Sequence, residues 1–146
     1  MTASAVERKS LLRTESRILD IDYHHGNGTQ AIFYADPTVL YCSLHAHPDD
    51  DYPYYWGEAS KRGAGDGEGF NRNWPLPQGT DDAHYLAALN EALVAIREFA
   101  PRYLVVSAGF DIVAGDPVGG FDVTREGLRE IGRRIADLEL PTLIVQ

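Results

Sequence analysis

Four short apolar segments alternate along the chain with longer segments that are polar or have a helical pattern. The apolar segments predict β-strands at residues 17–22, 39–44, 103–108 and 142–146. The last two are continuous runs of leucine and β-branched residues, which is typical of parallel strands covered on both faces. We therefore expect the strand at residues 142–146 to be buried.

Two segments have the apolar spacing of amphipathic helices. In residues 81–99, leucine or isoleucine recurs every three or four positions, and Thr80 is a candidate N-cap. Residues 125–138 repeat this pattern after Thr124. Because a strand follows each helix, the order of elements predicts an α/β fold with a parallel sheet and flanking helices.

The segment between the second predicted strand and the first predicted helix has no regular pattern. Residues 45–79 are rich in proline, glycine, aspartate and aromatic residues. Irregular segments longer than about 15 residues inside a compact domain are usually functional or disordered. We expect residues 1–146 to form one domain, because the chain is too short for two. Residues 1–16 are expected to be a helical or poorly ordered lead-in to it.

Composition narrows the class of protein. The chain has 146 residues, of which 44% are hydrophobic, and it contains no apolar run long enough to span a membrane. Its 22 acidic and 13 basic residues give a net charge of −9, which argues against nucleic acid as a partner. Residues 1–17 have no signal-peptide pattern and Cys42 is the single cysteine, so we expect a cytoplasmic location.

The acidic excess is concentrated in one region. Residues 47–82 contain eight acidic and three basic side chains, a net charge of −5. Such a region attracts cationic ligands, although solubility alone also explains an acidic surface.

A candidate metal site follows the first predicted strand. Asp20, Asp22 and His24 alternate along residues 20–28, and residues two apart in a strand point to the same side. Neighbouring carboxylates repel one another unless a cation lies between them, and carboxylates with an imidazole suit a divalent metal. The alternative is an acidic strand end that only caps the next helix.

Asp111 adds a third ligand at the end of another strand. It follows the run at residues 103–108, in the same place relative to its strand as the first motif. Asp22, His24 and Asp111 would leave further coordination positions open, as in catalytic rather than structural zinc sites. Taken alone, Asp111 is more simply read as a turn residue.

These motifs resemble those of a known superfamily. Residues 20–30 (DIDYHHGNGTQ), 43–45 (SLH), 73–77 (NWPLP) and 107–117 (SAGFDIVAGDP) are similar to the zinc-dependent histone deacetylase and acetylpolyamine amidohydrolase superfamily. Residues 52–57 (YPYYWG), 119–121 and 140–146 resemble its bacterial acetylpolyamine amidohydrolases in particular. The resemblance implies an arginase/deacetylase-like fold, incomplete in this chain, and hydrolysis of acetylated polyamines or acetyl-lysine-type substrates.

The resemblance also implies roles for individual residues. Asp22, His24 and Asp111 match the Zn²⁺ ligands, a site that Fe²⁺, Mn²⁺ or Co²⁺ could also occupy. A structural K⁺ or Na⁺ site corresponds to Asp20 and Ser43, with main-chain oxygens of Asp22, His24 and Leu44. A second monovalent site corresponds to main-chain oxygens near Phe33, Asp36, Val39 and Phe70. Tyr52 matches an aromatic wall of the substrate tunnel; packing of the long loop is the alternative role for the aromatic residues at 52–56.

Two catalytic motifs of the superfamily are not found among the 146 residues. One is a tandem histidine that activates water, since His24 of the pair His24-His25 is already assigned to the metal. The other is a glycine-tyrosine motif that stabilises the oxyanion. We therefore expect this chain to be inactive alone, or else to be a non-catalytic metal-binding fragment or partner domain. An arginase-like dimetal site would need a second acidic pair after Asp111, where only Asp116 is available.

Three further expectations concern histidines, the cysteine and self-association. His45, His47 and His84 are interpreted as hydrogen-bonded structural residues, and Cys42 as a core residue. Because residues 142–146 are an apolar strand with nothing following in the sequence, we expect exposed apolar patches beside the strand ends that carry Asp22 and Asp111, and self-association, including a homo-oligomer.

Overall fold

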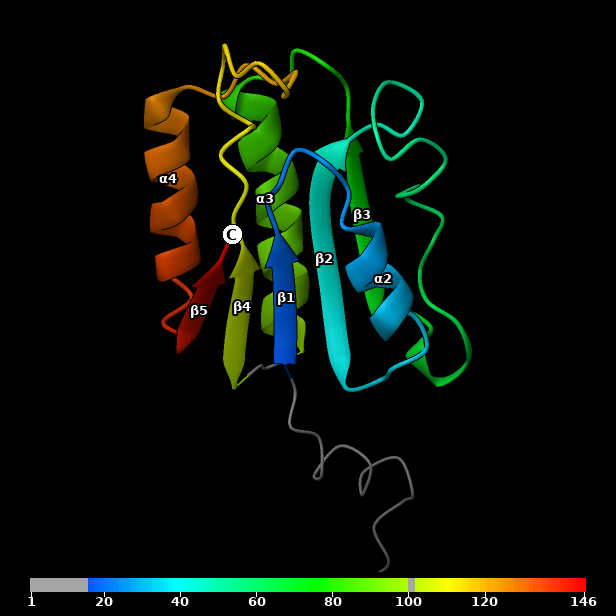
Figure 1. The fold of residues 1–146 in the computed structure, drawn as a ribbon. Coiled ribbons are helices and arrows are strands. Elements are labelled where there is room, and N and C mark those ends of the chain that lie inside the picture. Colours follow the sequence, from blue (N-terminus) through cyan, green and yellow to red (C-terminus); the bar gives the residue numbers. More distant parts are fainter. Residues whose placement is uncertain (1–15, 100–101) are drawn as a thin grey trace, which may run out of the picture.

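A five-stranded parallel sheet forms the centre of the computed structural model, which describes residues 16–99 and 102–146 (Figure 1). The lead-in expected at residues 1–16 falls almost entirely outside the described residues. The order across the sheet is β3-β2-β1-β4-β5, so β1 is central. The strands are β1 (Ser16–Asp20), β2 (Val39–Ala46), β3 (Asn71–Leu76), β4 (Tyr103–Ser107) and β5 (Thr142–Val145).

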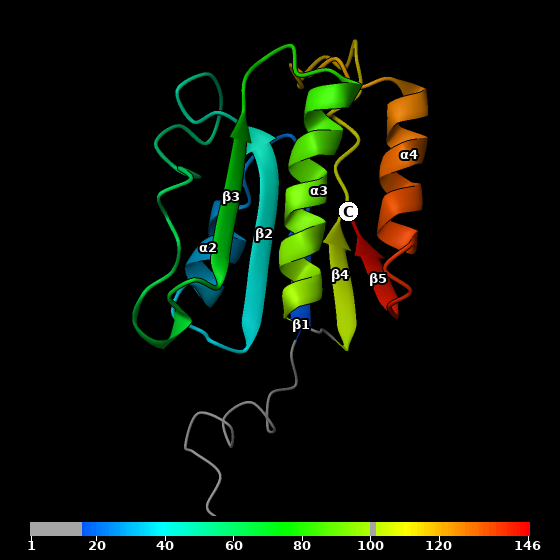
Figure 2. The ribbon, with the colours of Figure 1, turned by 180° about the vertical axis from the view of Figure 1, so that it is seen from behind.

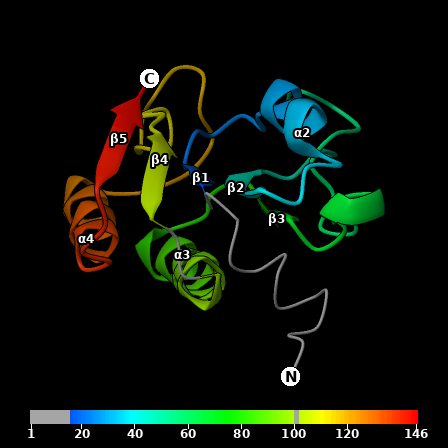
Figure 3. The ribbon, with the colours of Figure 1, turned by 90° about the horizontal axis from the view of Figure 1, so that it is seen from below.

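Helices lie on both faces of this sheet. The short helix α2 (Asn27–Phe33) packs on β2 from one side, while α3 (Asp82–Glu98) and α4 (Arg125–Ala136) lie side by side on the other (Figures 2 and 3). Asp81 rather than Thr80 caps α3, because its carboxylate accepts the His84 amide proton. Thr124 caps α4 as expected. The parallel sheet with flanking helices predicted from the sequence is confirmed.

The strand register places the carboxyl ends of three strands together. Asp20, the last residue of β1, pairs with Ser43 of β2 and with Ser107 of β4. Parallel strands end at the same edge of a sheet, so the loops that follow β1 and β4 meet there. All eight residues of β2 are buried, which makes this edge a rigid base for the side chains above it.

Two elements were not predicted. β3 lies within the segment expected to be irregular, because Asn71, Arg72, Asn73 and Pro75 hide its apolar alternation. A strand of this composition is tolerated at the sheet edge, where the proline removes no ladder hydrogen bond. α2 has only seven residues and no side-chain N-cap, so it carries no strong sequence signal.

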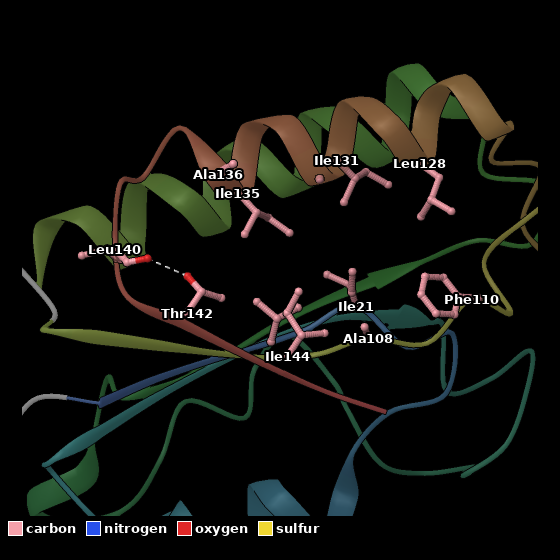
Figure 4. A pocket seen from close by; sticks show the side chains of 12 residues that line it. Ile21, Ala108, Phe110, Leu128, Ile131, Ile135, Ala136, Leu140, Thr142 and Ile144 are labelled. Atoms are coloured by element: carbon pink, nitrogen blue, oxygen red, sulfur yellow. Dashed lines mark hydrogen bonds between the residues drawn. The ribbon is translucent and has the colours of Figure 1, made fainter.

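The strand at residues 142–146 differs from expectation in burial. All four residues of β5 are exposed, with Ile144 at 67%. The reason is positional: β5 is one of the two outer strands of the sheet that the described residues form, and an apolar groove of about 470 Å³ separates it from α4. Figure 4 shows Leu128, Ile131 and Ile135 of α4 pointing into this groove, opposite Ile144. The expected exposed apolar patch is therefore present, whereas self-association stays a prediction.

No helix among the described residues combines the length and the apolar character that crossing a membrane requires.

Candidate metal centre

The loop after β1 carries two of the three predicted metal ligands. The alternation of these residues had suggested that they continue the strand. β1 instead ends at Asp20, so Asp22 and His24 lie in the loop that follows it. Two turns cause this: the Asp22 amide donates to Asp20 Oδ1 (3.2 Å), and the His24 amide donates to Asp22 Oδ1 (2.8 Å). Asp-centred turns of this kind bend the backbone away from the strand ladder. They also hold the Asp22 carboxylate beside the His24 ring.

Asp111 completes the cluster from the loop after β4. His24 Nδ1 lies 3.0 Å from Asp111 Oδ2 and 3.5 Å from Asp22 Oδ1. One ligand atom from each of the three residues lies within 4.8 Å of the others. The remaining oxygen, Asp111 Oδ1, accepts the Tyr23 amide proton at 3.0 Å, which fixes the orientation of the carboxylate.

Gly109 allows the two loops to approach this closely. A β-carbon at this position would lie 2.4 Å from Asp22 Oδ2 and 2.6 Å from Asp111 Oδ1. Any other residue would therefore push the two carboxylates apart, so this position requires glycine.

The electrostatics of the cluster favour a cation. Burial raises the pKa of Asp22, and the nearby Asp111 carboxylate adds to that increase. The side chains of Asp22, His24 and Asp111 remain partly accessible, so an ion and a substrate atom could reach them. Two carboxylates and one imidazole are ligands that Zn²⁺ accepts, and three protein ligands leave coordination positions open. The residues present thus fit a divalent metal.

Asp20 lies beneath this cluster in a separate, buried environment. It is 3% exposed, and its carboxylate accepts hydrogen bonds from the Tyr41 hydroxyl (2.8 Å) and the Asp22 amide. Burial raises the pKa of Asp20 to about 6, although these hydrogen bonds partly oppose the increase. Ser43, its predicted partner in the monovalent site, is fully buried and pairs with it in the strand register. The contribution of Tyr41 could not be read from the sequence, because residues 20 and 41 meet only through the sheet.

Replacing Asp20 by Ala is expected to lower the free energy of unfolding by about 1–3 kcal/mol, because the buried Tyr41 hydroxyl loses its shorter acceptor and keeps only the Gly26 carbonyl at 3.3 Å. Asp49→Ala is the control, since Asp49 is largely exposed and surface changes usually stay within about 0.5 kcal/mol. Thermal melts in KCl and in a large organic-cation chloride would measure both effects, with K⁺ stabilising only proteins that retain Asp20. A melt of Asp20→Ala in saturating K⁺ that matches the unmodified chain would count against the monovalent site.

The residues of the second predicted monovalent site come from separate segments that pack together. Phe33 ends α2, Asp36 follows it, Val39 begins β2 and Phe70 directly precedes β3. The Phe33 carbonyl accepts the Asp36 amide proton, and the Phe70 carbonyl accepts the Tyr41 amide proton. Gly67 of the 63–70 segment packs against the backbone of Ala35 so closely that a β-carbon would lie 2.6 Å from it. The four residues are neighbours, and their role as cation ligands remains a prediction.

Tyr52, the first residue of the aromatic segment after β2, lies beside the metal cluster. Tyr52 is 63% exposed, and its ring centre lies 6.2 Å from that of His24. Tyr54, Tyr55 and Trp56 are also exposed, which argues against the alternative that these rings pack inside the long loop. An exposed aromatic face beside the ligands can contact the apolar stem of a substrate.

His45 holds the far end of this aromatic segment. Its Nε2 lies 2.9 Å from the Gly57 carbonyl, which can only accept, so Nε2 carries the proton and Nδ1 accepts from Ser43. Burial lowers the pKa of His45 to about 3, which keeps the ring neutral. The structural role expected for His45 agrees with this geometry.

The remaining residues considered from the sequence have structural surroundings. His84 contacts the N-cap residue Asp81, and His47 accepts an amide proton from Asp49. Cys42 is a fully buried free thiol, as expected for a core residue. Asp116 binds the backbone amides of Val118 and Gly119. Asp116 therefore stabilises a turn, and this role does not favour a second metal site of the arginase type.

A parallel sheet with two carboxylates and an imidazole gathered at the carboxyl ends of its central strands defines an α/β protein with a candidate metal centre. Residues 3–146 match the family model of the histone deacetylase domain, so the chain belongs to that family. Its named members are deacetylases.

Individual relatives agree with this assignment. Acetylpolyamine amidohydrolase 1 of Pseudomonas aeruginosa is 48% identical over 128 residues, which cover 88% of this chain and 37% of the relative. The crystal structure of acetylpolyamine aminohydrolase from Burkholderia pseudomallei superposes with a TM-score of 0.89 at 42% identity, covering 96% of this chain and 41% of that one. An HDAC homolog complexed with SAHA gives a TM-score of 0.85 at 26% identity, covering 96% of this chain and 39% of that one. The chain thus spans about two fifths of the length of these relatives.

Proposed function

We propose that this chain is the metal-binding part of a zinc-dependent deacetylase that hydrolyses acetylated polyamines. The observation that carries the proposal is the convergence of Asp22, His24 and Asp111 to within 4.8 Å at the carboxyl ends of β1 and β4. A divalent ion held there lowers the pKa of a coordinated water and polarises an amide carbonyl, as amide hydrolysis requires. The expected K⁺ or Na⁺ near Asp20 and the cytoplasmic location, supported by the free thiol of Cys42, belong to the same proposal.

Each residue of the site has a distinct part in this chemistry. Asp22, His24 and Asp111 hold the ion, and the Tyr23 amide keeps one Asp111 oxygen turned toward the backbone so that the other faces His24. Tyr52 lies beside His24 and would contact the methylene stem that leads to the acetyl group. The substrate would enter from the exposed aromatic side of the cluster.

The preference for polyamine amides follows from charge. Residues 47–82 carry a net charge of −5 and include Tyr52 and the acidic residues at 49–51 beside it. An N-acetylated polyamine keeps protonated amines beyond its acetyl group, and these are attracted to acidic and aromatic surfaces. An acetyl-lysine peptide has a similar methylene stem, but it does not by its nature carry a protonated amine beyond the acetyl group. The names of the two bacterial relatives support the same choice.

Calorimetric titration of the zinc-loaded chain with N-acetylputrescine, N-acetylspermidine and an uncharged acetyl-lysine peptide tests the preference. We expect the polyamine amides to bind about 3- to 10-fold more tightly at low salt, with N-acetylspermidine the tighter of the two. The difference should shrink above about 0.5 M salt, where charges separated by more than a few ångströms are screened. Tighter binding of the peptide under all conditions would overturn the polyamine assignment.

A second function, a non-catalytic metal-binding partner domain, is kept because only one histidine, His24, lies in the described ligand cluster. In the superfamily that this chain resembles, water activation needs a separate tandem histidine. We propose accordingly that the 146-residue chain binds metal and ligand but does not turn over substrate alone.

A further inference from the structure

Tyr23 lies between Asp22 and His24 in the sequence, yet its hydroxyl binds a residue outside the cluster. The ring is fully buried and packs edge-on against His24 and Phe121, with ring centres 5.0 and 4.6 Å away. Gly120 makes room for the hydroxyl, since a β-carbon there would lie 2.6 Å from Tyr23 Oη. The packing of the ring therefore fixes the position of the hydroxyl group.

The Tyr23 hydroxyl donates to Asp51, the residue directly before Tyr52. Tyr23 Oη lies 2.9 Å from Asp51 Oδ2, and the other oxygen, Oδ1, accepts the Tyr52 amide proton at 2.8 Å. The Asp51 amide in turn donates to the His47 carbonyl. A single carboxylate thus joins the ring of Tyr23 to the backbone of Tyr52.

Tyr23 connects the metal cluster to Tyr52 through hydrogen bonds at both its backbone and its side chain. The Tyr23 amide binds Asp111 Oδ1, and its hydroxyl binds Asp51, which binds the Tyr52 amide. The Tyr52 side chain itself is exposed, so its own packing does not hold it beside His24. Asp49, Asp50 and Asp51 are neighbouring like charges that repel one another, and the Tyr23 hydroxyl is a donor that holds the Asp51 carboxylate in place.

We propose that Tyr23 and Asp51 are positioning residues that hold Tyr52 over the metal centre, and so set how tightly the stem of an acetylated amine is bound. The inference rests on the proposed function for the role of Tyr52. It extends that function by making ligand affinity depend on a hydroxyl that touches neither ligand nor metal. Gln78 is the second polar side chain beside this hydroxyl and does not reach the Tyr52 backbone in any described hydrogen bond.

Tyr23→Phe removes only the hydroxyl and keeps the ring and the amide that holds Asp111. The matched control is Tyr85→Phe, because Tyr85 is equally buried, also packs against Phe121, and its hydroxyl has no hydrogen-bond partner in the described structure. Asp51→Asn, with Asp49→Asn as its control, tests the other end of the bond.

Hydrogen exchange of residues 47–57, measured by mass spectrometry on the full 146-residue chain, reports the loop directly. We expect Tyr23→Phe to speed exchange of the protected amides of Asp50, Asp51 and Tyr52 about tenfold, and Tyr85→Phe to leave it unchanged. In the same variant, affinity for N-acetylputrescine should fall about 3- to 10-fold, while Zn²⁺ affinity stays within about twofold.

A double-mutant cycle separates positioning from general destabilisation. In a Tyr52→Leu background, Tyr23→Phe should no longer change N-acetylputrescine affinity, since the side chain being positioned is gone. Unchanged exchange of residues 47–57 in Tyr23→Phe would overturn the inference, as would an equal loss of Zn²⁺ and ligand affinity or additive losses in the cycle. If the unmodified chain binds Zn²⁺ but no acetylated amine, the proposed substrate fails, and the exchange rates alone decide whether Tyr23 and Asp51 hold the loop.

Discussion

Asp111→Asn is expected to weaken Zn²⁺ binding by at least about 100-fold. The variant removes the charge of one of the three proposed ligands, and loss of even an outer partner of a metal ligand costs about 10- to 100-fold in affinity. Asparagine has nearly the same shape, and its amide oxygen can still accept the Tyr23 amide proton. The change therefore removes the ligand charge while the loop that carries it keeps its anchor.

Competition with a chromogenic zinc chelator measures this effect, and Asp49→Asn is the control because it removes an exposed carboxylate that does not belong to the ligand cluster. The metal-free proteins should melt within a few degrees of one another, so a difference in affinity cannot be attributed to unfolding. Equal Zn²⁺ affinity in Asp111→Asn and the unmodified chain would show that Asp111 is not a ligand.

The zinc-loaded 146-residue chain is expected to hydrolyse N-acetylputrescine at least about 1,000-fold more slowly than the Burkholderia pseudomallei relative under the same conditions. Loss of one oxyanion donor typically costs about 10²–10³ in rate, and a general base contributes about 10²–10⁴. The sequence has five histidines, and none of the four other than His24 belongs to the metal cluster. His45 is hydrogen-bonded to Gly57, and His84 contacts the cap of α3.

Release of acetate, followed by a coupled assay, gives the rate, and the Asp111→Asn chain supplies the background. A rate close to that of the relative, lost in Asp111→Asn, would show that the 146 residues contain a base and an oxyanion donor that the superfamily motifs do not identify. A rate at background, together with tight Zn²⁺ and ligand binding, would agree with the proposal.

Hydrophobic pattern predicted the elements that build the centre of the fold. The runs that became β1, β2, β4 and β5 are apolar because these strands lie in a parallel sheet. Of the two long helices, α3 packs on β2 and β3, whereas α4 packs beside α3 and turns its apolar face toward the groove next to β5. β3 could not be found in this way, since Asn71 and Asn73 donate to Gln30 of α2 and their polarity serves a tertiary contact. The exposure of β5 was equally invisible, because a run of apolar residues does not tell a central strand from an edge strand.

The candidate metal ligands could be chosen from sequence because parallel strands end at one edge of a sheet. That rule brought Asp22 and Asp111 together although they are 89 residues apart. It did not show that Asp22 and His24 lie in a loop, since the turns depend on hydrogen bonds to carboxylates. The bonds from Tyr41 to Asp20 and from Tyr23 to Asp51 likewise have no sequence signal, because each joins segments that meet only in the folded chain.

Diffraction at the zinc absorption edge from crystals of the chain grown with Zn²⁺ tests the metal centre most directly. The proposal predicts an anomalous peak bonded to carboxylate oxygens of Asp22 and Asp111 and to His24 Nδ1, each at about 2.0–2.2 Å. Fe²⁺, Mn²⁺ or Co²⁺ at the same position would leave the centre intact and change only the native metal. A structure with these three side chains more than about 6 Å apart, or with zinc bound only elsewhere, would contradict it.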